Sequence, residues 1–157
     1  MFQTARLTCV LALGAIALSA QTFPAESVQT TGMAGIAAGQ TARLNLLNPG
    51  ALPPALGAIC TAAVTYFDGS GAILKTATVT VAPGTSMAVD LHGDTDLSLA
   101  PDARREIRAT IAIPAVPPPT AAASNTPPAC KLIPTLEIFD SITGRTQAIL
   151  GHVVTVD

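Results

Sequence analysis

Residues 60–81 read CTAAVTYFDGSGAILKTATVTV and contain two strand patterns joined by a short turn. In residues 60–67, apolar side chains at alternate positions share one face (Cys60, Ala62, Val64 and Tyr66). Residues 68–71 (DGSG) are types that tolerate a positive φ, as hairpin turns require. Residues 76–81 then alternate strictly, with the threonines facing out and Ala77, Val79 and Val81 facing in. This stretch predicts an antiparallel hairpin with one buried face.

The same period of two recurs along most of the remaining chain. Strands are expected near 28–36, at 41–46, around 87–91, at 106–113, in a segment ending at Phe139, and at 147–156 with a break or bulge at Gly151. The expected inward sets are Ala42, Leu44 and Leu46; Met87, Val89 and Leu91; Ile107, Ala109, Ile111 and Ile113; and Leu136 with Ile138. Residues 101–104 predict a single helical turn at a corner between sheets. Seven or eight short strands favour an all-β, antiparallel immunoglobulin-like sandwich, with a closed barrel as the alternative.

The first twenty residues have the layout of a secretory signal peptide. Arg6 precedes an apolar run, residues 7–18, which is too short for a hydrocarbon core that needs about 20 residues. Small residues before Gln21 predict cleavage after Ala20, with a retained anchor or a buried helix as the alternative. We therefore expect a chain that is secreted, on the cell surface or in the periplasm, with one domain over residues 21–157.

Removal of the leader leaves two cysteines, Cys60 and Cys130, which predict a disulfide in an oxidising compartment. Two free buried thiols are the alternative. A bridge across 70 sequence positions would stabilise the fold by about 4 kcal/mol in the chain-entropy model. In an immunoglobulin-like order, the strands that follow Cys60 and Cys130 would share one sheet, with the 106–113 strand between them.

A proline-rich segment precedes each cysteine, at 48–59 and at 114–129. In the predicted order both segments would lie at the same end of the sandwich. Loops at one end of a sandwich often carry binding, and stiff polyproline segments lose little entropy on docking. These two loops are candidates for binding a glycan, a metal or a partner protein, against the alternative of plain solvent-exposed loops.

The charge and the catalytic inventory are both small. Charged residues make up 11% of the chain and the formal net charge is −2, so we expect neither nucleic acid nor an anionic membrane surface as a partner. The histidines are His92 and His152, and the sequence has no Gly-x-Ser-x-Gly, Gly-rich phosphate loop or Cys-x-x-Cys motif. We therefore expect a protein that is not an enzyme and needs no cofactor, and a hydrolase is the least favoured hypothesis.

Residues 90–96 (DLHGDTD) form the densest polar cluster and contain Asp90, His92, Asp94 and Asp96. Carboxylates favour calcium, and histidine with aspartate favours zinc or copper. A chain turn is expected at Gly93, however, and it would scatter these side chains. A solvated turn is therefore preferred over a metal site.

Arg104, Arg105 and Arg108 form the one basic group of the sequence. Arg104 and Arg108 would share a side of the strand with Glu106, and Arg105 would point away. We expect these arginines to pair with surface aspartates, namely Asp90, Asp94, Asp96 or Asp102. A site for an anion or a polysaccharide is the alternative.

Two segments of the chain echo one another. Cys60 leads to Phe67, Asp68 and a turn with Gly71, and Cys130 leads to Phe139, Asp140 and a turn with Gly144. Further matching blocks that would indicate a duplication are absent from the sequence. We interpret the echo as two strands that lead into hairpins of the same kind.

Five blocks together resemble a known group of proteins. They are residues 39–45 (GQTARLN), 67–71 (FDGSG), 82–86 (APGTS), 136–140 (LEIFD) and 143–146 (TGRT). The chain resembles small secreted immunoglobulin-like β-sandwich proteins of environmental bacteria, over most of its exported part. The resemblance implies a secreted β-sandwich, and it implies no functional residue because that group has no assigned activity.

The sequence thus favours a non-catalytic module that acts by contact. Export, low charge, outward threonines such as Thr76, Thr78 and Thr80, and open sheet edges all suit a surface, adhesive or matrix component that self-assembles or binds another surface protein. A module that binds a ligand through the proline-rich loops is the alternative, and a glycan is one candidate partner. No membrane span is expected in the mature chain.

Overall fold

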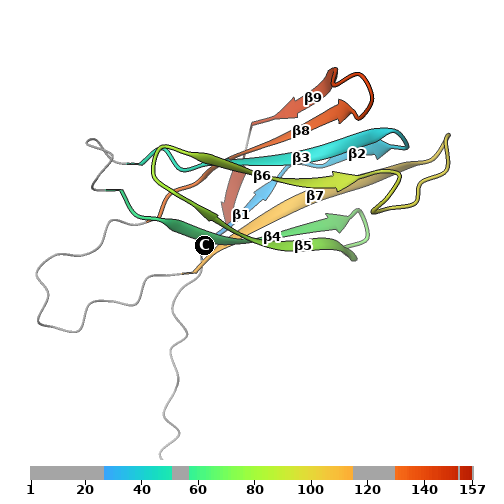
Figure 1. Cartoon of the computed structure of the whole chain (residues 1–157). Coiled ribbons are helices and arrows are strands. Elements are labelled where there is room, and N and C mark those ends of the chain that lie inside the picture. Colours follow the sequence, from blue (N-terminus) through green and yellow to red (C-terminus); the bar gives the residue numbers. More distant parts are fainter. Residues whose placement is uncertain (1–26, 51–56, 115–129, 152, 157) are drawn as a thin grey trace, which may run out of the picture.

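The computed structural model describes residues 27–50, 57–114 and 130–151, together with the backbone of residues 153–156. The described strands form two antiparallel sheets, consistent with a β-sandwich (Figure 1). The first sheet contains β1 (Ser27–Thr31), β2 (Ala34–Ala37), β4 (Cys60–Asp68), β5 (Ile73–Val81), β7 (Arg104–Ile113) and β10 (Val153–Val156). The second contains β3 (Gln40–Leu47), β6 (Ser86–His92), β8 (Ile133–Asp140) and β9 (Thr146–Leu150). The predicted leader, residues 1–20, lies outside the described residues.

Alternation of side chains along the strands builds the core between the two sheets. The alternate sets predicted on β3, β4, β7 and β8 are all buried, as are Val79 and Val81 on β5. Outward Thr76, Thr78 and Thr80 are exposed, as predicted. Tyr66 is fully buried, and its hydroxyl donates to the backbone oxygen of Val89 at 2.9 Å across the two sheets. Burial raises the pKa of the Tyr66 phenol.

Met87 departs from the predicted pattern. It was expected to face the core with Val89 and Leu91, but 45% of its surface is exposed. Met87 is the second residue of β6, which is an edge strand of the second sheet. Its neighbours therefore cover it from one side only, although it is in register with the buried Leu46.

The chain ends also differ from the predicted strands. The single strand expected near 28–36 is two strands, β1 and β2, separated at Gly32 and Met33. Both lie along the same edge of β7, because β4 occupies its other edge. The expected break at Gly151 is confirmed, and it is larger than a bulge: β9 pairs with β8 in the second sheet, whereas β10 pairs with β1 in the first.

The connection from β6 to β7 is a turn between the two sheets, as predicted, but it is not helical. Pro101 and Asp102 occupy a turn in which the amide of Ala103 donates to the oxygen of Ala100 at 2.9 Å. One hydrogen bond closes this turn, and β7 begins at Arg104.

The predicted disulfide is present, but the predicted placement of its two strands is wrong. Cys60 is the first residue of β4 in the first sheet, and Cys130 precedes β8 in the second sheet. The strand expected between them, β7, pairs with β4 but has its other edge occupied by β1 and β2, so β8 pairs with β3 instead. The bridge, with a Cα–Cα distance of 5.3 Å, therefore ties the two sheets together at one end.

Candidate binding groove between β2 and β9

On one side of the two-sheet structure, two strand edges have no neighbouring strand among the described residues. Along one side of β7 the first sheet continues with β2 and β1, and β10 pairs with β1 but not with β2. Within the described residues, β2 pairs only with β7, and β9 pairs only with β8. Two strand edges from different sheets therefore border the same flank without a further strand partner in the part of the chain that the structure describes.

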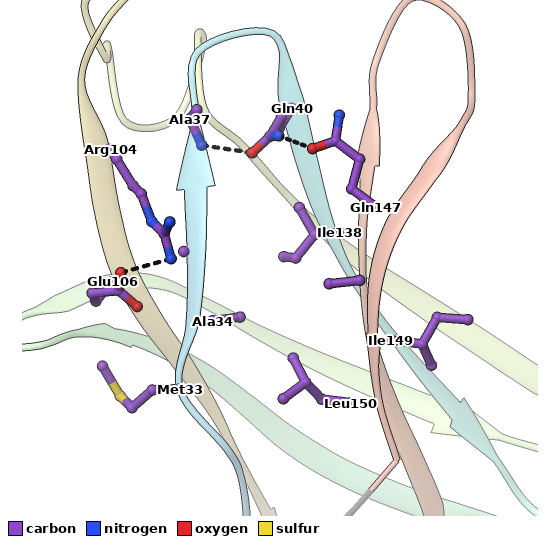
Figure 2. A pocket seen from close by; sticks show the side chains of 12 residues that line it. Met33, Ala34, Ala37, Gln40, Arg104, Glu106, Ile138, Gln147, Ile149 and Leu150 are labelled. Atoms are coloured by element: carbon purple, nitrogen blue, oxygen red, sulfur yellow. Dashed lines mark hydrogen bonds and ion pairs between the residues drawn. The ribbon is translucent and has the colours of Figure 1, made fainter.

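A groove with a volume of about 560 Å³ lies between these two edges (Figure 2). Its floor is apolar: Ala34, Ile138 and Leu150 approach one another between β2 and β9, and Ala148 also lines it. Ala148 is in register with the buried Ile138, yet it is exposed, because no described strand covers β9 on this side. The groove thus offers alternate apolar positions of one strand to a ligand, a geometry suited to an extended chain.

Two exposed apolar residues extend the lining of the groove. Met33, between β1 and β2, is 46% exposed, and Ile149 on β9 is 66% exposed. Figure 2 shows Ile149 pointing away from the groove, while Leu150 next to it points in. The apolar surface therefore continues from the floor onto the outside of β9.

Polar pairs close the rim. The side-chain amide of Gln40 donates to that of Gln147 across the end of the groove, and the Gln40 oxygen accepts from the amide of Ala37 at 2.8 Å. On the β7 side, Arg104 lies 3.0 Å from Glu106. The Arg104 guanidinium crosses β2 at Gly35, where an added Cβ would lie 1.9 Å from Nε. Glycine at position 35 therefore allows a neutralised ion pair to lie beside the groove.

The acidic cluster 90–96 is dispersed by the fold. Asp90 accepts two hydrogen bonds from Arg43, at 2.8 and 2.7 Å, and Arg43 lowers the pKa of this carboxyl. Asp94 accepts from the amide of Gly39 at 2.7 Å. Asp96 accepts from Lys75 and from the amide of His92, both at 2.8 Å; its partial burial would raise its pKa, but these contacts lower it. Each carboxylate thus has a structural partner of its own.

His92 belongs to a row of hydrogen bonds that the sequence pattern did not reveal. The Thr41 hydroxyl lies 2.9 Å from His92 Nδ1 and 2.7 Å from the Ser141 hydroxyl, and Thr41 is almost fully buried. This row fastens β6 and the β8–β9 turn to β3. In the described residues no group of three or more His, Cys, Asp or Glu side chains is arranged to hold a metal ion.

The basic group does not pair as predicted. Arg104 pairs with Glu106, two residues along the same face of β7, and not with a surface aspartate. Arg108 lies over the Phe67 ring, with Cζ 4.6 Å from the centroid. Arg43, which sequence reasoning did not single out, takes the place beside Asp90 that was expected for these arginines. The pairing follows strand register, which brings β3 beside β6.

The other predicted binding region lies mostly outside the described residues. This applies to residues 51–56 of the first proline-rich segment, to residues 115–129 of the second, and to His152. At the described border of the first segment, Asn48 is buried and its side-chain amide donates to the oxygens of Ala58 and Val81 at 2.9 and 3.0 Å. Asn48 therefore fixes the chain on both sides of that segment, a role that its place at the start of a proline-rich segment did not reveal.

Comparison with known proteins gives no relative of this chain. No family model matches the chain, and no curated protein or solved structure matches it. None of the described residues forms a helix long and apolar enough to cross a membrane.

Proposed function

We propose that this chain is an exported immunoglobulin-like module that acts by contact, without catalysis, as a surface, adhesive or matrix component. The observation that carries the proposal is the groove between β2 and β9, whose apolar floor is bordered by two strand edges. Open strand edges are templates for pairing with another chain. When an extended chain adds to such an edge, main-chain hydrogen bonds supply affinity and alternate side-chain pockets supply specificity.

The charged side chains also support contact over chemistry. At the groove, Arg104 pairs with Glu106, and elsewhere on the surface Arg43 pairs with Asp90 and Lys75 with Asp96, so these groups neutralise one another. An active site needs acid, base or nucleophilic groups that converge on a substrate. The groove instead presents alanine, isoleucine and leucine side chains, and its rim carries amides and an arginine–glutamate pair, Arg104 with Glu106.

Export is part of the proposal. The apolar run at 7–18, the resemblance to secreted β-sandwich proteins and the Cys60–Cys130 disulfide all suit an oxidising compartment outside the cytosol. Disulfides form and persist in secreted and extracellular proteins and are rare in cytosolic ones.

A substitution that fills the groove tests this function. Protein exported with its own leader is labelled and added to cells of the strain that produces it, and saturable binding is measured. Ala148→Arg should weaken binding by about tenfold or more, because the long cationic side chain occupies the apolar floor. Ala88→Arg is the matched control, since Ala88 is exposed on β6 at the opposite edge of the same sheet.

Equal binding by the Ala148→Arg, Ala88→Arg and unmodified proteins would overturn the proposal. Thermal unfolding of all three shows whether both variants are folded. Because Ala148 is exposed, its replacement should change the free energy of unfolding by no more than an ordinary surface substitution does, about 0.5 kcal/mol.

A further inference from the structure

We infer that the occupant of the groove is the N-terminal segment of a second copy of this chain, residues 21–26 (QTFPAE), added as a strand beside β2. The inference rests on the proposed function and names the partner of the same site. It follows from strand register, from the reach of the segment and from its side-chain pattern.

The strand register shows that an extended strand would fit in the groove beside β2. Thr31 on β1 pairs with Val153 on β10, so the chain before Val153 would run beside β2 if residues 146–156 formed one strand. The chain instead changes sheets at Gly151, and β9 pairs with β8, where Leu150 lies opposite Leu136. Among the described residues, no strand occupies the position beside β2, and an extended segment placed there would continue the line of β10.

The length of residues 21–26 allows them to reach the groove of a second copy but not the groove of their own chain. Residues 27–33 separate the start of β1 from β2, which is about 23 Å of extended chain. In a chain cleaved after Ala20, the six residues 21–26 span about 20 Å. They would have to run back along all of β1 before pairing with β2, so the groove of another copy is accessible to them and their own groove is not.

The side chains of the segment match the groove. In an extended conformation Phe23 and Ala25 face the same way, and they alternate with Pro24. The floor offers Ala34, Ile138 and Leu150 to such a pair, and Phe23 would be its anchor. Pro24 lacks an amide donor, which an added edge strand tolerates.

The two halves of this contact lie toward opposite ends of the molecule. Ser27 is in register with Ile113, toward the end that carries the disulfide, whereas β2 runs alongside the start of β7, toward the opposite end. A contact between different patches is heterologous, and its repetition joins copies head to tail, into a ring where the rotation closes and into a filament where it does not. The module would therefore assemble head to tail by strand addition.

Complementation between two variants tests the inference. The exported protein should form concentration-dependent oligomers in sedimentation velocity, and Phe23→Asp or Ala148→Arg should each weaken self-association by about tenfold or more. An equimolar mixture of the two variants should form heterodimers and no longer chains, because one variant retains the groove and the other the segment. Ala88→Arg should assemble like the unmodified protein.

The other outcomes separate the inference from the proposed function. If Ala148→Arg abolishes assembly while Phe23→Asp does not, the groove binds a different strand and the inference is overturned, whereas the proposed function stands. A strictly monomeric unmodified protein overturns the inference too, and loss of cell-surface binding in Ala148→Arg would then still support the proposed function. Assembly that neither substitution affects, together with unchanged cell binding, overturns both.

Discussion

The β4–β5 and β8–β9 hairpins begin alike and end differently. In each, a strand ends in Phe-Asp, the pairing register shifts at the residue before the aspartate, and a glycine with positive φ follows in the turn. The glycines are Gly71 at φ 89° and Gly144 at φ 69°. An arginine from the neighbouring strand covers each ring: Arg108 lies over Phe67 and Arg43 over Phe139.

The aspartates perform the same task in the two turns. Asp68 Oδ1 accepts from the amides of Ser70 and Ala72, both at 2.9 Å, and from the Ser70 hydroxyl at 2.6 Å. Asp140 Oδ1 accepts from the amides of Ile142 and Thr143 and from the Thr143 hydroxyl, at 2.7 to 3.0 Å. The interpretation that both strands lead into hairpins of the same kind is therefore confirmed by the turn contacts.

The second strands diverge. β5 has nine residues and buries Val79 and Val81 in the core, whereas β9 has five residues that are almost all exposed. The difference arises beyond the turn, because the chain leaves the second sheet at Gly151 to pair β10 with β1. The same turn contacts thus precede a partly buried edge strand in the first sheet and an exposed edge strand in the second, which the proposed function uses for binding.

Removing the disulfide should have the largest effect, because it ties together the starts of the chain segments that lead to the two hairpins. The double substitution Cys60→Ala with Cys130→Ala opens a loop with a sequence separation of 70. The free energy of unfolding, measured by urea denaturation, should fall by about 4 kcal/mol. A loss below about 1 kcal/mol would show that the two sheets hold each other without the bridge.

Two side-chain truncations, one on β5 and one on β9, measure how differently these strands contribute to stability. Val81→Ala on β5 removes methyl groups from a fully buried site and should cost about 2 kcal/mol of stability. Ile149→Ala on β9 should cost less than about 0.5 kcal/mol, since the side chain is 66% exposed. If both substitutions lowered the free energy of unfolding equally in urea denaturation, Ile149 would have to be buried in solution, as Val81 is.

The smallest effect is expected from the two turn aspartates, and it should be equal in both hairpins. Hydrogen bonds from Ser70 lower the pKa of Asp68, and those from Thr143 lower the pKa of Asp140. A lowered pKa in the folded state contributes stability above the ordinary carboxyl pKa of about 3.9, and this contribution is lost as the pH falls through the folded-state value.

Unfolding measured as a function of pH checks this equality. Asp68→Asn and Asp140→Asn should each flatten the loss of stability between about pH 5 and pH 2, and by similar amounts. A flattening by one variant alone would show that the two turns are alike in geometry but not in energy.

Local patterns were sufficient to predict most of the strands and the two hairpin turns, but not the strands with which each one pairs. The alternation around Tyr66 and Leu44 predicted which side chains are buried, because a strand has two faces wherever it packs. The sheet to which β8 belongs depended on whether β7 still had a free edge, and β1 and β2 had taken that edge. Strands that are far apart in the sequence compete to pair with the same edge. A short stretch of sequence therefore cannot show which of them pairs there.

The candidate site shows the same limit. Asp90 and His92 were noticed because polar groups clustered in the sequence, but register placed Arg43 and Thr41 beside them and gave them structural roles. The residues that line the groove, such as Ala34 and Ala148, carry no chemical signal of their own. What distinguishes them from other alanines is their position on two edges that no described strand covers.

The sequence by itself determined the all-β character, the faces of most strands, the two hairpin turns and the pair of cysteines, because strand period, turn φ and cysteine count act locally or by simple counting. Tertiary structure alone decided the sheet that each strand joins, the change of sheet at Gly151 and the groove that this change leaves beside β2. An edge is open or covered according to every other strand in the molecule, and that is a property of the assembled fold.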